Sequence, residues 1–222
     1  VSEACRTAFT SVFPQLTSRV IVIENILPTA FVRKSAEEFQ TAREMPPKGI
    51  RLLSVGRYCA QKNFDNIPDI CARLLKAGLD VHWYIIGFGP DEQLIRQRIM
   101  EFGLTDRVIL LGKKENPYPY IKACDLYVQP SRYEGKAVTV REAQMLGKPV
   151  IITDYATAAA QLENGKDGLI VPMSNAGCAE GIRSLALDRE WQLRLSGECL
   201  SQDYSNADQA DKLLRIVMPA DK

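Results

Sequence analysis

The sequence predicts an α/β protein built on a doubly wound parallel sheet. Short apolar runs recur along the 222 residues, and several of them end directly at a glycine or a proline. Stretches with the apolar spacing of a helix lie between these runs. Strands that alternate with helices form βαβ units, whose right-handed crossovers place helices on both faces of a parallel sheet.

The expected strands are rich in Val, Ile, Leu and aromatic residues, which suit a sheet buried on both faces. They are residues 50–55, 81–86, 108–111, 126–128, 150–152 and 168–171. An earlier run, Arg19 to Ile23, has the same composition and predicts a further buried strand.

Helical patterns fill the intervals between the strands. The expected helices are residues 3–13, 64–77, 91–102, 118–123, 138–146 and 156–162, and the chain beyond 187 is also helical in pattern. Gly78, Gly103 and Gly147 stand where glycine commonly ends a helix. Residues 25–47 carry mixed helix and loop signals, with a break at Pro46-Pro47. We expect one domain over residues 1–222, with a core of about 19–187 and outer helices over about 188–217.

Composition excludes several classes of protein. Lys and Arg number 28 against 27 Asp and Glu, so a net charge of +1 favours neither nucleic acid nor an anionic membrane as a partner. No apolar run approaches the length of a membrane span, and the charged start is unlike a signal peptide. The six cysteines form no CxxC pair and there is one histidine. We therefore expect reduced thiols and no metal site.

Cations gather where the predicted strands end, although the whole chain is nearly neutral. In a parallel sheet these carboxyl ends form the ligand-binding edge. The residues at this edge are basic, small or acidic. They are Gly56, Arg57 and Lys62 after the strand at 50–55, Gly87 after 81–86, Gly112, Lys113 and Lys114 after 108–111, and Ser131, Arg132, Glu134 and Lys136 after 126–128. Glycine permits close approach of backbone to ligand, and Arg and Lys neutralise phosphate. This local excess predicts an anionic ligand.

The segment from Pro130 to Glu142 is the most informative part of this edge. Glu134 and Glu142 lie eight positions apart, and the start of the expected helix lies between them. A strand, a polar turn and a helix N-terminus in that order can seat a phosphate. Carboxylates beside that seat can accept hydrogen bonds from sugar hydroxyls. The pattern predicts a ligand that carries both phosphate and sugar.

Two other features have simpler interpretations. Gly87-Phe88-Gly89 is not a full GxGxxG fingerprint, so a nicotinamide dehydrogenase is not supported. His82 lies inside a predicted strand, which favours a structural histidine over a catalytic one.

Taken together, these motifs resemble the C-terminal, donor-binding half of the family 4 retaining glycosyltransferases, which have the GT-B fold. The resemblance runs from Val1 to about Ile216. Its motifs are Gly56-Arg57 with Lys62-Asn63, Ile86 to Pro90, Leu111-Gly112, Ala123 to Ser131, Glu134-Gly135 with Glu142-Ala143, Gly147 to Val150, and Asn164-Gly165 with Asp167 to Val171. The Glu-x7-Glu spacing within this ordered set is the most specific of them. The resemblance implies a Rossmann-like domain.

The resemblance also implies roles for individual residues. Arg57 and Lys62 are expected to hold the donor diphosphate and to stabilise the departing nucleotide. Glu134 is expected to bind the donor sugar and Glu142 the ribose hydroxyls, while Gly112 and Lys113 face the base. These assignments make Arg57, Lys62 and Glu134 catalytic. The donor-binding set is Gly56, Gly87, Gly112, Lys113, Ser131, Gly135, Lys136, Ala137, Val138 and Glu142, with the amides of residues 135–138 at the helix N-terminus and Lys136 where many members are apolar or aromatic.

For the whole protein, the family implies transfer of a hexose from UDP or GDP to a glycan or lipid-linked acceptor, with retention and without a metal or other cofactor. It further implies bacterial polysaccharide biosynthesis. Members carry an N-terminal domain that supplies the acceptor site, and we expect this chain to lack it. We therefore expect the chain to bind nucleotide but to transfer little sugar alone. The expected location is the cytoplasm, with membrane association through the other half. The sugar, the linkage and the oligomeric state stay open.

Three alternatives remain. A non-hydrolysing nucleotide-sugar epimerase shares the GT-B architecture but needs more acidic and histidine residues in its cleft. A non-catalytic nucleotide-binding module would have a degenerate site, whereas Arg57, Lys62, Glu134 and Glu142 are intact. A flavodoxin-like response regulator would need an acidic cluster at strand ends that are basic here.

Overall fold

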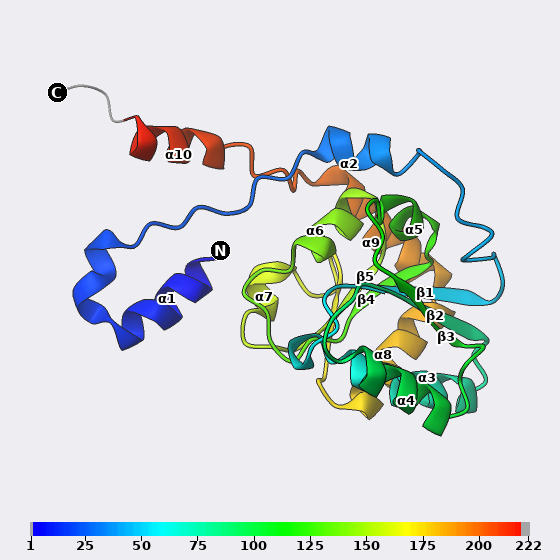
Figure 1. Cartoon of the computed structure of the whole chain (residues 1–222). Coiled ribbons are helices and arrows are strands. Elements are labelled where there is room, and N and C mark those ends of the chain that lie inside the picture. Colours follow the sequence, from blue (N-terminus) through cyan, green and yellow to red (C-terminus); the bar gives the residue numbers. More distant parts are fainter. Residues whose placement is uncertain (1, 219–222) are drawn as a thin grey trace.

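The computed structural model describes residues 2–218, which form a six-stranded parallel sheet flanked by helices (Figure 1). The strands are β1 (Ile50–Val55), β2 (Val81–Ile86), β3 (Val108–Gly112), β4 (Leu126–Gln129), β5 (Val150–Thr153) and β6 (Leu169–Val171). Their order in the sheet is β3-β2-β1-β4-β5-β6, and every neighbouring pair is parallel. The predicted doubly wound sheet and its six later strands are confirmed.

The strand order reverses between β1 and β4, and this reversal positions the site. The helices that follow these two strands pack on opposite faces of the sheet: α3 (Ile67–Lys76) joins one hydrophobic cluster and α6 (Val138–Met145) joins the other. Such a switch point leaves a crevice at the carboxyl ends of the strands. At the opposite ends, the Asp125 carboxylate accepts hydrogen bonds from the Arg51 backbone (2.8 Å) and guanidinium (2.9 and 3.1 Å).

Helices cover both faces of the sheet, as the sequence predicts. On one face α3, α4 (Glu92–Glu101) and α8 (Asn175–Leu187) contribute to the larger cluster, which centres on Trp83. On the other face α5 (Tyr118–Ala123), α6 and α7 (Ala158–Gln161) pack around Tyr127. Helix α9 (Arg189–Ser201) contacts both α6 and α8. The predicted helix at 64–77 begins with a 3-10 turn (Phe64–Asn66), and α7 is shorter than predicted.

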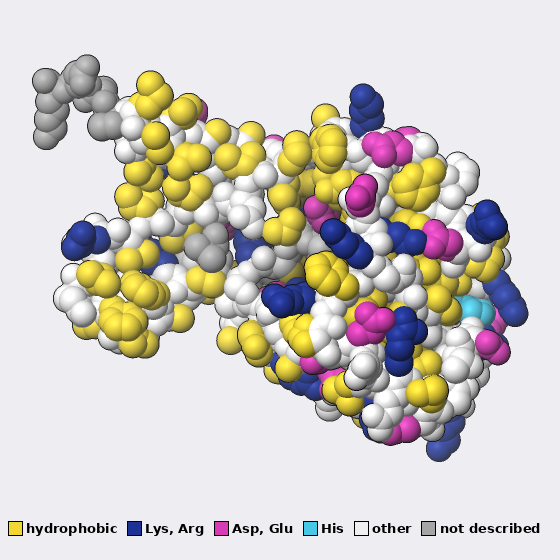
Figure 2. Space-filling model, viewed as in Figure 1, with side chains coloured by type: hydrophobic (Ala, Val, Ile, Leu, Met, Phe, Trp, Pro, Cys, Tyr) yellow, Lys and Arg dark blue, Asp and Glu magenta, His cyan; other side chains and the backbone are white. Residues whose placement is uncertain are grey.

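The segments at either end of the chain extend away from the sheet (Figure 1). Helix α1 (Glu3–Val12) and a 3-10 turn (Pro14–Arg19) lead through residues 20–28 to α2 (Thr29–Ser35), and α10 (Gln209–Val217) lies beyond α9. Hydrophobic side chains gather over α1 and α10 (Figure 2), where Val12, Val217 and Met218 are exposed. No helix within residues 2–218 is both long enough and apolar enough to cross a lipid bilayer.

The strand predicted at Arg19 to Ile23 is wrong. Arg19 ends the 3-10 turn, and the four residues after it belong to no strand of the described sheet. Val20 has the extended backbone that a β-branched residue favours, but Ile21 is 61% exposed. A strand also needs a neighbour for its N–H and C=O groups, and this run pairs with no strand of the sheet described within residues 2–218. An apolar run alone therefore predicts the backbone conformation here but not sheet pairing.

Gly87 permits β1 and β2 to end in contact with each other. Its φ is +151°, and a Cβ there would lie 1.9 Å from the Gly56 carbonyl oxygen. We predict that Gly87→Ala lowers the free energy of unfolding by about 2–4 kcal/mol, from backbone strain and overpacking together. Gly103→Ala is the control, because φ is +64° and the space is open, so only about 1–2 kcal/mol is expected. Equal losses of unfolding free energy in urea titrations of the two variants would contradict the close approach of Gly87 to the Gly56 carbonyl.

Candidate functional site

A cavity of about 470 Å³ opens at the carboxyl ends of β1, β2 and β3. Its lining is continuous along the three strand ends and combines glycine, apolar and basic residues. The lining residues are Val55, Gly56, Arg57, Ile86, Gly87, Phe88, Lys113, Lys114 and Pro117. The structure therefore brings together four of the predicted site residues, namely Gly56, Arg57, Gly87 and Lys113.

Backbone hydrogen bonds fix the floor of this cavity. The Gly56 amide donates to the Ile86 carbonyl (3.0 Å), and the Gly87 amide donates to the Gly112 carbonyl (3.0 Å). Gly112 itself has φ of +69°, a conformation that glycine adopts without strain. These contacts hold the ends of three strands together, although the register between β2 and β3 shifts at Ile85/Ile86.

Two cations at this edge carry no ion pair within residues 2–218. The Arg57 side chain is exposed and has no hydrogen-bond or ion-pair partner in that range, while the Lys113 ammonium lies 5.7 Å from the centre of the Phe88 ring. By contrast, Lys114 pairs with Glu44 at 2.5 Å. The cavity therefore has two positive charges that no protein carboxylate neutralises.

Glu134 lies beside the cavity as a buried, fully engaged carboxylate. Its side chain is 5% exposed and accepts hydrogen bonds from Lys62 (2.5 Å), Ser131 (2.6 Å) and Gln61 (3.0 Å). A Cβ on Gly56 would meet the Lys62 side chain at 3.1 Å, so the ion pair borders the cavity. Ser131 is buried and aims its hydroxyl at Glu134, which makes it a support for that carboxylate.

Glu142 lies on α6, one turn into the helix. Its Oε1 accepts a hydrogen bond from the Tyr118 hydroxyl (2.9 Å), and Tyr118 follows the cavity residue Pro117. Burial raises the pKa of Glu142, and the Tyr118 hydrogen bond opposes that rise. Thr139 ties the same helix to the Val55 carbonyl (3.4 Å) at the cavity wall. The two glutamates thus flank the strand ends from different elements.

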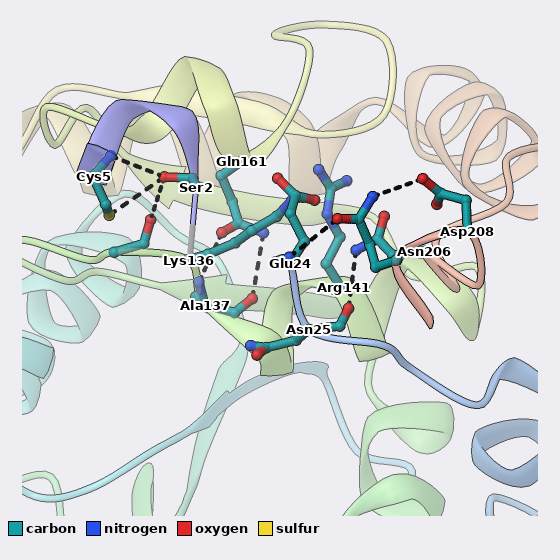
Figure 3. A network of polar contacts seen from close by, with 12 residues as sticks. Ser2, Cys5, Glu24, Asn25, Lys136, Ala137, Arg141, Gln161, Asn206 and Asp208 are labelled. Carbon is teal, nitrogen blue, oxygen red and sulfur yellow. Dashed lines mark hydrogen bonds and ion pairs between the residues drawn. The ribbon is translucent and has the colours of Figure 1, made fainter. Parts of the chain in front are cut away.

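The remaining predicted residues face elsewhere. Lys136 forms an ion pair with Glu24 (Figure 3), and both line a second pocket of about 340 Å³ that shares no lining residue with the Gly56 cavity. The Ala137 amide, expected to meet the ligand, donates to Gln161 Oε1 (2.8 Å). Val138 packs beside the small cluster that contains Tyr204.

Gly135 and Arg132, in the same turn, are also engaged. The Gly135 carbonyl accepts a hydrogen bond from Ser2 Oγ (3.4 Å), and Arg132 is bound by Asp65 (2.8 Å) and by the Ala60 carbonyl. Of the amides expected to meet the ligand over residues 135–138, the Ala137 amide is the one shown with a protein acceptor among the described residues.

Sequence reasoning missed several residues that shape the site. Gln61 and Tyr118 each donate to one of the glutamates, and Phe88 is 57% exposed at the cavity. The only sequence signal for Gln61 was its position next to Lys62. The position of Phe88 between two glycines at a strand end could have indicated its role. Tyr118 is distant in sequence from Glu142 and gave no signal. Within residues 2–218, no cluster of three His, Cys, Asp or Glu side chains could hold a metal ion.

Comparison with known proteins shows the family. The family described as glycosyl transferases group 1 matches residues 35–198. An alpha-D-kanosaminyltransferase of Streptomyces kanamyceticus is 28% identical over 65% of this chain and 38% of its own length. The lipopolysaccharide core biosynthesis glycosyltransferase LpsE of Rhizobium meliloti is 25% identical over 75% of this chain and 49% of its own. The chain thus spans less than half the length of either relative.

Solved structures agree on the fold. The structure of HepE from Anabaena in complex with UDP has a TM-score of 0.83 at 19% identity, over 97% of this chain and 62% of its own. The lipopolysaccharide glycosyltransferase WaaG has a TM-score of 0.72 at 18% identity, over 90% of this chain and 56% of its own. The fold is that of one Rossmann-like domain of the GT-B glycosyltransferases. The chain belongs to the glycosyl transferases group 1, and the resemblance found in its sequence is confirmed.

Removal of only one partner of the Lys62–Glu134 ion pair should destabilise the folded protein. The two side chains are 15% and 5% exposed, so Lys62→Met leaves a buried carboxylate without its cation. We predict a loss of about 3–5 kcal/mol in the free energy of unfolding for Lys62→Met, and a smaller loss when Glu134→Gln is added. Urea unfolding of the single and double variants measures this. Equal losses in Lys62→Met and in the double variant would refute the coupling.

The raised pKa of Glu142 gives a second stability prediction. Because this pKa lies above its ordinary value of 4.5, the stability that protonation provides is present at low pH and lost as the pH rises through the folded-state pKa. Glu142→Gln should therefore be more stable than the wild type at pH 7, with the difference vanishing below about pH 4.

Glu180→Gln is the control for Glu142→Gln. Arg183 lowers the pKa of the exposed Glu180, so this variant should show no gain at pH 7. Urea titrations of both variants at several pH values decide the matter. If the stability of Glu142→Gln relative to the wild type does not change with pH, burial does not disfavour the charged form of this carboxylate.

Proposed function

We propose that this chain is the donor-binding half of a retaining glycosyltransferase that takes a UDP- or GDP-linked hexose. The observation that carries the proposal is the pattern of charge pairing at the strand ends. Four cations there, Lys62, Lys114, Arg132 and Lys136, are each paired with a carboxylate, and Arg57 and Lys113 line the cavity without one among residues 2–218. A site with two unneutralised cations on a glycine-rich floor suits a diphosphate.

Glu134 and Glu142 each have an unused hydrogen-bond acceptor position that a nucleotide sugar could fill. An ionised carboxylate offers about four lone-pair positions, and Glu134 uses three of them. We assign the fourth to a hydroxyl of the donor sugar. Glu142 Oε1 accepts from Tyr118, which leaves Oε2 for the ribose hydroxyls. Phe88 and Lys113 line the cavity, and Gly112 directly precedes Lys113, so we assign the base to that side of the cavity.

The chemistry assigned to the cations is stabilisation of the departing nucleotide diphosphate. Negative charge grows on the leaving group as the glycosidic bond to the diphosphate breaks, and fixed cations in a partly desolvated site favour that state. Arg57 would bind the diphosphate bidentately, and Lys62 would share its ammonium between Glu134 and the phosphate. In this proposal the side-chain cations do the work that a metal ion does elsewhere.

The acceptor and the complete reaction belong to the whole protein and are part of the proposal. One relative is named as a lipopolysaccharide core biosynthesis glycosyltransferase, which supports a glycan or lipid-linked acceptor. We propose that the acceptor site lies in an N-terminal partner domain and that the chain alone transfers little sugar. Membrane association would come through that partner domain. Efficient turnover by the 222-residue chain would refute this division of roles.

Titration calorimetry with UDP, UMP, GDP and ADP at several salt concentrations tests the donor site. We expect one nucleoside diphosphate to bind more tightly than its monophosphate, with an affinity that falls as salt rises. Arg57→Ala should weaken that diphosphate about tenfold to hundredfold, because a charge-assisted hydrogen bond is lost. Lys113→Ala should weaken it by less.

Arg96→Ala is the matched control, because this arginine pairs with Glu92 on the surface of α4. It should leave nucleotide affinity unchanged. If no diphosphate binds better than its monophosphate, or if Arg57→Ala and Arg96→Ala behave alike, the cavity is not a diphosphate site.

A further inference from the structure

The turn that carries Glu134 is tied to α7 at two points. Thr157 Oγ1 donates to the Glu134 carbonyl (2.6 Å), and Gln161 exchanges hydrogen bonds with the Ala137 backbone (2.8 and 3.3 Å). These contacts lie within the sheet domain, on the same face of the sheet as α6. They fix the two ends of a four-residue turn and leave its centre to be held by something else.

The centre of the turn is held by residues that precede the sheet in sequence. Ser2 Oγ, at the start of α1, donates to the Gly135 carbonyl (3.4 Å), and Lys136 Nζ pairs with the Glu24 carboxylate. Figure 3 shows Ser2 and Glu24 approaching Lys136 and Ala137 from separate segments. Residues 20–28, here termed the linker, therefore touch the turn whose first residue is Glu134.

The Lys136 side chain depends on this partner because its charge is buried. The side chain is 10% exposed, and that of Glu24 is 26% exposed. An ammonium out of water is stable only when paired or hydrogen-bonded. Without Glu24, the ammonium has to be hydrated in the pocket that it lines, and the turn loses the ion pair that joins its centre to residues 20–28.

The linker is itself fixed by the segment before α10 and by the first residue of α10. The Leu27 amide donates to the Ser205 carbonyl (2.8 Å), Asn206 donates to the Asn25 carbonyl (3.0 Å), and the Glu24 amide donates to Gln209 (3.4 Å). Figure 3 shows the Asn206 contact beside Glu24. Glu24 is thus a bridge between the two end segments of the chain and the turn at 134–137.

We propose that Lys136 is a positioning residue, which couples the linker to the sugar-facing carboxylate of Glu134. The inference rests on the donor site proposed above and goes beyond it. Any displacement of the linker alters the Glu24–Lys136 pair and then the turn, while Arg57 and Lys113 project from the rigid strand ends and stay in place. The coupling therefore acts on the sugar part of the donor and leaves the diphosphate part unchanged.

The test compares the wild type with Glu24→Gln in two measurements on the full chain. Hydrogen–deuterium exchange of peptides spanning residues 130–140, without ligand, reports the turn directly. Calorimetry with UDP and UDP-glucose, and with GDP and GDP-mannose, reports the sugar pocket. We expect exchange about threefold to tenfold faster in Glu24→Gln, and a ratio of sugar-nucleotide affinity to diphosphate affinity about threefold to tenfold lower, with diphosphate affinity unchanged.

Two further variants separate positioning from a loss of folding. Lys136→Arg keeps the charge and should retain most of the wild-type affinity ratio. Glu24→Asp keeps the charge on a shorter side chain and gives an intermediate result if Glu24→Gln does not fold. Lys122→Met is the matched control, because the exposed Lys122–Glu37 pair also joins the region before the sheet to the folded body. It should leave both measurements at their wild-type values.

The outcomes are distinguishable. Wild-type exchange and a wild-type affinity ratio in Glu24→Gln would overturn the coupling, as would an equal change in Lys122→Met. If the wild type binds none of the four nucleotides, the proposed function fails, and the exchange measurement alone still decides whether Glu24 holds the turn.

Discussion

The site depends on keeping one buried carboxylate charged. Glu134 is 5% exposed, and a carboxylate in that position is stable only if its lone pairs are met by good donors. Lys62 supplies the opposite charge, and Ser131 and Gln61 supply two further hydrogen bonds. These donors come from the chain after β1 and from the chain after β4, which are neighbours only because the strand order reverses between them. The topology of the sheet and the chemistry of the carboxylate therefore support each other.

The same electrostatic reasoning separates cations that hold the structure from cations that are available to a ligand. Arg132 is bound by Asp65 and by a backbone carbonyl, and Lys136 is bound by Glu24, so both stabilise the turn around Glu134. Arg57 and Lys113 have no such carboxylate within residues 2–218. A net charge near zero conceals this division, because it counts paired and unpaired side chains alike.

Much of the fold could be predicted from the sequence because the strands from 50 onward are buried on both faces, and burial leaves a strong apolar signal. The run at Arg19 to Ile23 carries the same signal and forms no strand, since pairing depends on a neighbour that local sequence does not specify. At the site, glycines and cations next to strand ends were predictable from their position in the chain. The Glu24–Lys136 and Tyr118–Glu142 contacts were not, because they join residues 112 and 24 positions apart.

Glu142 gives the clearest support for the proposal that this edge of the sheet binds a ligand. Burial raises the pKa of its carboxyl group, so the charged form lowers the stability of the folded protein at neutral pH. Tyr118 recovers only part of that stability through one hydrogen bond, and a glutamine could accept the same bond without the cost of a buried charge. The partner of Glu142, Tyr118, follows the cavity residue Pro117, so a carboxylate that burial disfavours lies close in the fold to a cavity with two unpaired cations, which supports the proposal of a ligand with hydroxyl donors and negative charge. A nucleotide sugar has both.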